Sequence, residues 1–237
     1  MTIVNESDTL LSIKNVFNTY NNRNSFLKNF TIFKNEEKKN VLKNINIEIK
    51  KGEIFGLTGK SGCGKTTLAR CILGLVNYEG EIFLNGQKTQ KNQIQIVFQD
   101  PGASLNPVKK IGTLLEEPLL INKIGKRQER KQKVDRMLLR VGLDPSYKSR
   151  KAHELSGGQK QRVCIARALI MEPKLLIADE AISSLDVSVG SQILNLFNKL
   201  NKNTGLGILF ISHNKNALEY LCNRIAVMEN GSIINYL

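Results

Sequence analysis

Two segments near the start of the chain alternate apolar and polar residues, which is the pattern of half-buried β-strands. They cover residues 10–17 (LLSIKNVF) and 44–49 (NINIEI), and in both every second side chain faces the same side of a sheet. Residues 21–40 between them are rich in Asn and Lys, which predicts an exposed loop. The start of the chain therefore indicates two strands that each turn one face toward solvent.

Further along, short continuous apolar runs predict strands that are covered on both faces. Apolar residues three and four positions apart predict helices between these runs. The strands are expected at 54–59, 94–99, 174–179 and 207–212, the helices at 66–75 and 126–141 with a further apolar stripe over 189–200, and a Pro/Gly/Asn turn at 100–107. Strands that alternate with helices indicate an α/β fold with a mostly parallel sheet.

Length, charge and cysteine usage narrow the class of protein. The 237 residues contain no internal repeat and no flexible linker, so we expect one domain over 1–237. The net charge of +14 favours an anionic partner, and charge alone does not rank nucleotide, nucleic acid and acidic lipid. The four cysteines lack CxxC spacing, which indicates neither a zinc site nor a disulfide framework and fits a reducing cytosol. With no leader pattern and no long apolar run, we expect a soluble chain or one held at a membrane by partners.

A glycine-rich loop lies between the predicted strand 54–59 and the helix that follows it. Gly59, Gly64, Lys65 and Thr66 match the spacing of a phosphate-binding loop, in which backbone N–H groups and the helix start surround phosphates. Lys65 would reach the β- and γ-phosphates of ATP, and the Thr66 hydroxyl would ligate Mg²⁺. A glycine turn capped by a surface lysine is the alternative. The predicted ATP-binding residues are Gly59, Lys60, Ser61, Gly62, Cys63, Gly64, Lys65, Thr66 and Thr67.

Two acids follow the strand predicted at 174–179. Asp179 stands where a carboxylate can hold the Mg²⁺ of such a site, and Glu180 can accept a proton from an attacking water. Adjacent acids after a strand are otherwise common surface residues, so this interpretation depends on the glycine loop. The pair and the loop together predict a P-loop NTPase, with a small-molecule kinase as one alternative.

A second glycine loop, Ser156, Gly157 and Gly158 within HELSGGQKQRVCIARAL, also opens a predicted helix. The series GKSGCGKTT, VFQDP, LSGGQ, LLIADE, SSLD and FISH resembles the ATP-binding subunit of an ABC transporter, in this order over almost the whole chain. The resemblance implies a P-loop core with a mostly parallel sheet, an N-terminal antiparallel β subdomain and a helical subdomain inserted at about 100–160. It implies ATP and Mg²⁺ as cofactors and ATP hydrolysis as the activity.

The same resemblance implies further site residues. Gln99 would touch Mg²⁺, Asp186 would lie in the loop that links two ATP sites, and His213 would hold the γ-phosphate, although a histidine after an apolar strand is by itself more often structural. Tyr20 would stack on adenine, with Phe17 or Phe33 as alternatives. The residues that would contact ATP held by a second subunit are Ser156, Gly157, Gly158 and Gln159.

Within the family, the stretch from Ile94 to Leu120 resembles the peptide and nickel import branch. Ala181 after Asp179 and Glu180, together with the end of the chain at Leu237, favours nickel or a related transition metal as cargo, with di- or oligopeptides as the alternative. The implied partners are two transmembrane permease subunits, a second ATPase subunit and, indirectly, an extracytoplasmic binding protein. The implied location is the cytoplasmic face of the cell membrane. A soluble ABC ATPase that acts on nucleic acid is a distant alternative, and we expect no nucleic-acid partner.

Overall fold

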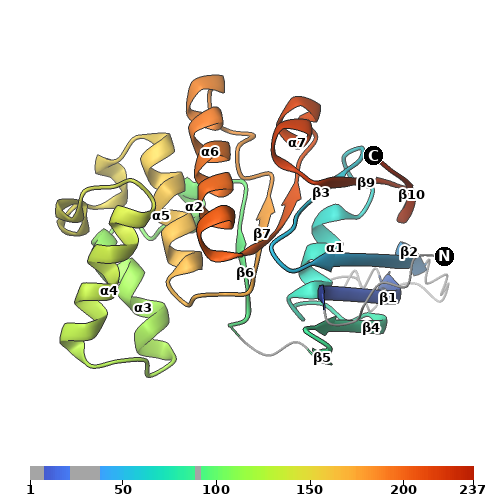
Figure 1. Cartoon of the computed structure of the whole chain (residues 1–237), viewed down its shortest axis with the longest axis horizontal. Helices are drawn as coiled ribbons and strands as arrows, with labels where there is room; N and C mark the ends of the chain where they lie inside the picture. Colours follow the sequence, from blue (N-terminus) through green and yellow to red (C-terminus); the bar gives the residue numbers. More distant parts are fainter. Residues whose placement is uncertain (1–7, 22–37, 89–91) are drawn as a thin grey trace, which may run out of the picture.

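The computed structural model describes residues 8–21, 38–88 and 92–237. Its strands form two sheets, and its helices gather mainly on one side of the larger sheet (Figure 1). The strands are β1 (Thr9–Asn21), β2 (Lys38–Lys50), β3 (Ile54–Thr58), β4 (Glu79–Leu84), β5 (Gln87–Lys88), β6 (Ile94–Val97), β7 (Leu175–Asp179), β8 (Gly207–Ile211), β9 (Arg224–Glu229) and β10 (Ser232–Tyr236). The α-helices are α1 (Lys65–Ile72), α2 (Pro101–Ser104), α3 (Ile111–Ile121), α4 (Arg127–Arg140), α5 (Gly157–Leu169), α6 (Val187–Thr204) and α7 (Lys215–Leu221).

The larger sheet has six strands in the order β10-β9-β3-β8-β7-β6, and all neighbours except β10 and β9 are parallel. The central strands β3, β8 and β7 are buried on both faces, as their continuous apolar sequences predict. The side chains of β7 alternate between two hydrophobic clusters. Leu175 and Ile177 belong to the cluster that includes the antiparallel sheet, and Leu176 and Ala178 to the cluster that includes α3, α4 and α5. The predicted α/β class with a mostly parallel sheet is confirmed.

The smaller sheet is antiparallel, in the order β2-β1-β4-β5. In the pair of β1 and β2, Ile13 lies opposite Ile47, and both side chains are buried. The predicted strands at 10–17 and 44–49 are present but longer than expected, since β2 begins at Lys38 and β1 ends at Asn21. The prediction of a loop over 21–40 was therefore wrong at its two ends, because backbone pairing overrides the polar composition there; residues 22–37 lie outside the described residues.

Helices α3, α4 and α5 lie together on the far side of the large sheet from the antiparallel sheet (Figure 1). The predicted stripe on α4 is present, with Val134, Met137 and Leu138 buried. The turn predicted at 100–107 contains the one-turn helix α2. Its start is stabilised by the Asp100 side chain, which accepts hydrogen bonds from Gly102 N at 2.7 Å and Ala103 N at 3.1 Å.

None of the described helices is both long and apolar enough to cross a lipid bilayer.

Candidate active site

One cavity of about 620 Å³ lies at the carboxyl ends of β3 and β7, the edge where open α/β sheets bind ligands. The structure brings most of the predicted site residues to it from the phosphate loop (Gly59–Thr67), the end of β7 and the end of β8. Its lining comprises Val41, Gly59, Lys60, Ser61, Gly62, Gly64, Lys65, Thr66, Thr67, Gln99, Asp179, Glu180 and His213. Cys63 of the loop is buried and is not among these lining residues.

The phosphate loop requires glycine at two positions because neighbouring chain occupies the space of a side chain. A Cβ on Gly59 would lie 2.1 Å from the carbonyl oxygen of Met228 in β9. A Cβ on Gly64, which has φ +115° and precedes α1, would lie 2.9 Å from Met228 Cε and 3.0 Å from Leu42. The loop is thus held between the antiparallel sheet and β9.

Lys65 is the first residue of α1, and its side chain turns back into the loop. Its Nζ donates hydrogen bonds to the carbonyl oxygens of Gly59 at 2.7 Å and Lys60 at 3.1 Å. The side chain is 8% exposed. Its Nζ also lies 3.9 Å from Cys63 Sγ. A buried cation whose described hydrogen-bond partners are all uncharged is well placed to receive an anionic ligand in the loop.

Asp179 at the end of β7 is 5% exposed, and its Oδ1 atom has no hydrogen-bond partner among the described residues. Burial raises the pKa of the Asp179 carboxyl above its usual value, and the charge of Glu180 adds to the increase. A hydrogen bond from the Thr66 side chain and the charges of Lys65 and Arg70 act in the opposite direction. The carboxyl is therefore costly to ionise until a cation or donor reaches it.

Glu180 lies in the left-handed region, with φ +52°, and its backbone N donates to Ile211 O at 2.9 Å. Its carboxylate oxygens Oε1 and Oε2 lie 3.0 and 2.9 Å from Nδ1 of His213. The carboxylate side chain is mostly buried, while the histidine is 69% exposed at the mouth of the cavity. This geometry places a proton acceptor beside a group that can orient it.

Gln99 follows β6, and its carbonyl accepts a hydrogen bond from Ser184 Oγ at 3.2 Å. The contact joins the segment before α2 to the segment between β7 and α6. The contact therefore connects a residue that lines the cavity, Gln99, to the segment that leads into helix α6.

The structure does not bring the signature loop (Ser156–Gln159) to this cavity. Ser156 caps α5, where Gln159 N donates to Ser156 Oγ at 3.4 Å and Ser156 N donates to Gln159 Oε1 at 3.0 Å. Asp186 likewise caps α6 by accepting from Val189 N at 2.9 Å, and it lines a neighbouring cavity that His213 also borders. Within this chain none of these residues lines the cavity of the phosphate loop.

The prediction for adenine stacking lies largely outside what the structure describes. Tyr20 belongs to β1, but its side chain is not described, and Phe33 falls in the undescribed segment. Phe17 is described and is 41% exposed. Val41 lines the cavity although the sequence interpretation did not select it. The sequence offered one signal for Val41. Val41 and Leu42 are adjacent apolar residues, so they cannot both face the buried side of a strand, and one of them must be available for another contact.

The family description "ABC transporter" matches residues 42–183 of the chain. The chain belongs to the ABC transporter family, and its fold is that of the ABC ATPase, a P-loop NTPase, as the sequence predicted.

Named relatives resemble almost the whole chain. The glutathione import ATP-binding protein GsiA of Pectobacterium atrosepticum is 39% identical over 98% of this chain and 38% of its own length. The oligopeptide transport ATP-binding protein OppF of Haemophilus influenzae is 40% identical over 98% of this chain and 73% of its own length. This chain thus spans well under half of the first relative and about three quarters of the second.

Among solved structures, the dimeric ATP-binding cassette MJ0796 in a post-hydrolysis state with bound ADP and phosphate is similar. It superposes with a TM-score of 0.80 at 30% identity, over 96% of this chain and 98% of that one.

Proposed function

We propose that this chain is the ATP-hydrolysing subunit of an ABC importer whose cargo is a peptide of the oligopeptide or glutathione type. The cavity that joins the phosphate loop to Asp179, Glu180 and His213 carries the ATPase part of this proposal. The relatives' names for glutathione and oligopeptide import support the cargo. They give no support to the nickel expectation, which was based partly on Ala181, and they favour the peptide alternative.

The proposed partners are two transmembrane permease subunits and a second ATPase subunit, which is either another copy of this chain or a homologue. An extracytoplasmic binding protein would deliver the peptide, and this chain would lie on the cytoplasmic face of the membrane. The dimeric cassette with ADP and phosphate supports a paired arrangement. In such a pair the exposed start of α5 could meet ATP held by the other subunit.

ATP would bind with its phosphates in the loop Gly59–Thr67, where Lys65 Nζ exchanges carbonyl contacts for phosphate oxygens. The orphaned Oδ1 of Asp179 beside the Thr66 hydroxyl fits Mg²⁺, which prefers oxygen ligands. Thr66, Gln99 and Asp179 would hold this ion, directly or through its waters. Bound there, it would neutralise charge on the phosphate oxygens.

Glu180 would accept the proton of the attacking water, and His213 would orient that carboxylate. As the imidazolium, with a proton on each ring nitrogen, His213 would donate from Nδ1 toward Glu180 across 2.9–3.0 Å and from Nε2 to a phosphate oxygen. The base and the phosphate loop come from different strand ends of one sheet. Their relative position is therefore fixed by the parallel pairing of β3, β8 and β7.

Glu180→Gln tests the assignment of the base. The amide keeps the shape of the side chain but cannot accept the proton, so turnover should fall about 10²- to 10⁴-fold while ATP affinity changes little. Turnover is measured by phosphate release, and ATP affinity by calorimetry. Glu219→Gln, an exposed carboxylate paired with Lys215 on α7, is the matched control. Near-normal turnover by Glu180→Gln contradicts the assignment.

Uptake in the native host tests the cargo. Wild type and a chromosomal Glu180→Gln variant are compared for accumulation of radiolabelled glutathione, a labelled dipeptide and labelled nickel. Loss of glutathione or dipeptide uptake alone supports the proposal. Loss of nickel uptake alone overturns the cargo and leaves the ATPase assignment intact.

A further inference from the structure

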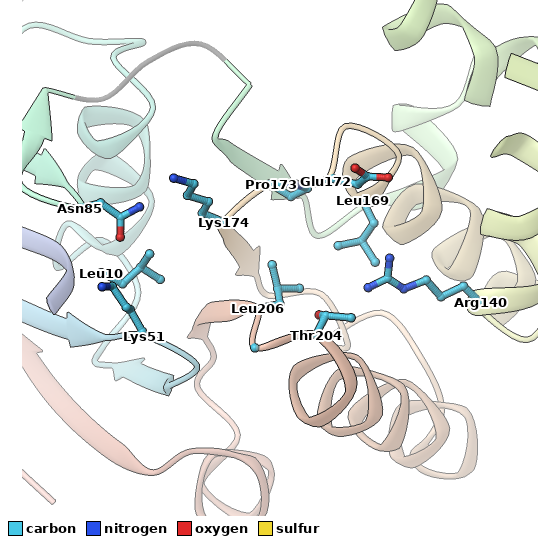
Figure 2. A pocket seen from close by; sticks show the side chains of 11 residues that line it. Leu10, Lys51, Asn85, Arg140, Leu169, Glu172, Pro173, Lys174, Thr204 and Leu206 are labelled. Carbon is cyan, nitrogen blue, oxygen red and sulfur yellow. The ribbon is translucent and has the colours of Figure 1, made fainter. Parts of the chain in front are cut away.

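A second cavity, of about 700 Å³, opens at the opposite edge of the parallel sheet (Figure 2). Lys174 immediately precedes β7, whose other end carries Asp179. Lys174 and Asp179 are five residue steps apart along the strand, which corresponds to about 17 Å. The volume falls in the range of roughly 300–1,000 Å³ that is typical of small-molecule sites. The proposed ATPase function makes no use of this cavity.

Part of the cavity wall is apolar and tightly packed. Leu10, Leu169 and Leu206 line it, and their side chains are otherwise almost completely buried. A Cβ on Gly207 would lie 2.1 Å from Leu10 Cδ2, so the Leu10 side chain fills the space that a side chain at position 207 would need. The close packing fixes the antiparallel sheet against the large sheet at this point, which makes the cavity a preformed feature of the fold.

The charged groups of the lining are mainly basic. Lys51, Lys174 and Arg140 belong to three separate parts of the chain: the turn after β2, the residue before β7 and the end of α4. Figure 2 shows Arg140 reaching in from the helical side, with Lys174 and Lys51 on the opposite side. No described carboxylate lies within 4.0 Å of the charged nitrogens of Arg140 or Lys174.

The acid of the lining does not offset this charge. Glu172 Oε1 pairs with Lys133 Nζ at 2.9 Å, and Lys133 is not among the residues that line the cavity. The ion pair offsets the charge of Glu172, and Arg140 and Lys174 are the cations of the lining with no described carboxylate beside them.

Asn85 supplies a polar group that lacks a partner. Its backbone N donates to Leu10 O at 2.7 Å, which fixes the residue at the cavity wall. Its Oδ1 atom is buried without a hydrogen-bond partner among the described residues. This oxygen has almost no accessible surface, so it is an unsatisfied polar group within the cavity wall, and a flip of the amide would put the nitrogen in its place.

We propose that this cavity binds a small organic anion with at least two carboxylate or phosphate groups. Cations on opposite sides of the cavity match a ligand with separated anionic groups, and the leucines match an apolar segment between them. Lysine and arginine recognise carboxylate and phosphate by the same charge-assisted hydrogen bonds, so the shared chemistry defines the class. Since ATP would occupy the other edge of the sheet, the two ligands would not compete for space.

Isothermal calorimetry on the full 237-residue chain tests the proposal, with the nucleotide cavity filled by saturating ADP. The probes are citrate for carboxylates and pyrophosphate for phosphates, with acetate as the single-charge reference. We expect one of the first two to bind with a Kd of about 1 mM or lower and acetate to bind at least tenfold more weakly. Binding of citrate alone, or of pyrophosphate alone, supports the proposal and identifies the anionic group. Binding of neither overturns it.

Charge-reversal variants separate a site from general attraction to a basic chain. Arg140→Glu and Lys174→Glu should each weaken the bound probe at least tenfold. Arg136→Glu makes the same change one turn earlier on α4, outside the lining, and should weaken it less than about twofold. Equal weakening by all three overturns the proposal. If a glutamate variant fails to fold by circular dichroism, the glutamine variant at the same position replaces it, with an expected loss of about threefold.

Discussion

The phosphate loop (Gly59–Thr67) and the signature loop (Ser156–Gln159) are both glycine-rich starts of helices, but the chain surrounds only the first. Met228 and Leu42 close on the glycines of the phosphate loop, and Lys65 fills its centre. In the signature loop Ser156 and Gly157 are exposed, and the described contacts of its side chains stay on the helical side. One chain therefore encloses one phosphate loop and presents a second helix start whose first residues, Ser156 and Gly157, remain exposed.

Lys65→Ala should produce the largest effect, because it removes the buried cation from the enclosed loop. ATP affinity should fall at least about 100-fold, since a charge-assisted contact to phosphate contributes roughly 3 kcal/mol in such a site. Calorimetry with ATP measures the change. Lys199→Ala, an exposed lysine on α6, is the control for loss of one positive charge. Equal affinities of the Lys65→Ala and Lys199→Ala chains would show that the loop does not receive the phosphates.

Gly157→Ala tests the open loop. A Cβ there would lie 3.7 Å from Leu185, an ordinary contact, so the fold should tolerate it. In the proposed pair of subunits the methyl group would stand between the start of α5 and the partner's ATP. We therefore expect turnover to fall about tenfold with ATP binding by the isolated chain unchanged.

Gly190→Ala in α6 is the matched helix glycine for that experiment, because a Cβ there meets no atom within 4 Å. Both substitutions should change stability by no more than about 1 kcal/mol. A loss of ATP binding by the isolated Gly157→Ala chain would mean that the signature loop acts within its own subunit.

How far the sequence could predict these two loops depends on how local their contacts are. The strand before the phosphate loop, the helix after it and the helix after the signature loop follow from patterns within a few residues, and all three were predicted from them. The contacts of Met228 with the phosphate loop join positions more than 160 residues apart. No periodicity or motif encodes such a pairing, so the support of the loop from β9 became visible only in the structure.

The short helix α2 shows a different limit. Asp100 followed by Pro101 is a good helix start, because the acid caps and the proline needs no N–H partner. The glycine, asparagine and second proline that follow gave the whole stretch the composition of a turn. Local signals conflicted there, and the packing of α2 against α5 decided the outcome.

Gly231→Ala tests the support of the phosphate loop from behind. Gly231 has φ +84°, its N donates to Cys63 O at 3.1 Å, and a Cβ on it would lie 2.4 Å from Val41 O. The added methyl must displace either the Val41 segment, which borders the nucleotide cavity, or Gly231 itself, which is bonded to Cys63 of the phosphate loop. We therefore expect KM for ATP to rise about fivefold with little change in kcat. Thermal unfolding should show a loss of roughly 2–3 kcal/mol.

Gly86→Ala isolates the backbone contribution to that loss. Gly86 has φ +72°, but a Cβ there meets no atom within 4 Å. It should cost only the left-handed conformation, about 1 kcal/mol, and leave KM unchanged. If both variants shift KM equally, the β9–β10 turn does not position the phosphate loop.

Asp179→Asn should have the smallest effect on the nucleotide-free fold. It measures how much stability the chain loses by burying the Asp179 carboxyl beside the phosphate loop. Burial raises the pKa of the Asp179 carboxyl, so the unfolded chain ionises at lower pH than the folded chain. Stability is then lost as pH rises from about 4 through the folded pKa. The variant avoids this loss, so its Tm advantage over wild type should grow from pH 4 to pH 7. Asp186→Asn, at an exposed helix cap, should show no such growth. A pH-independent difference for Asp179→Asn would mean that burial does not oppose ionisation there. The cavity beside the phosphate loop would then hold no destabilised carboxylate that a bound cation could stabilise.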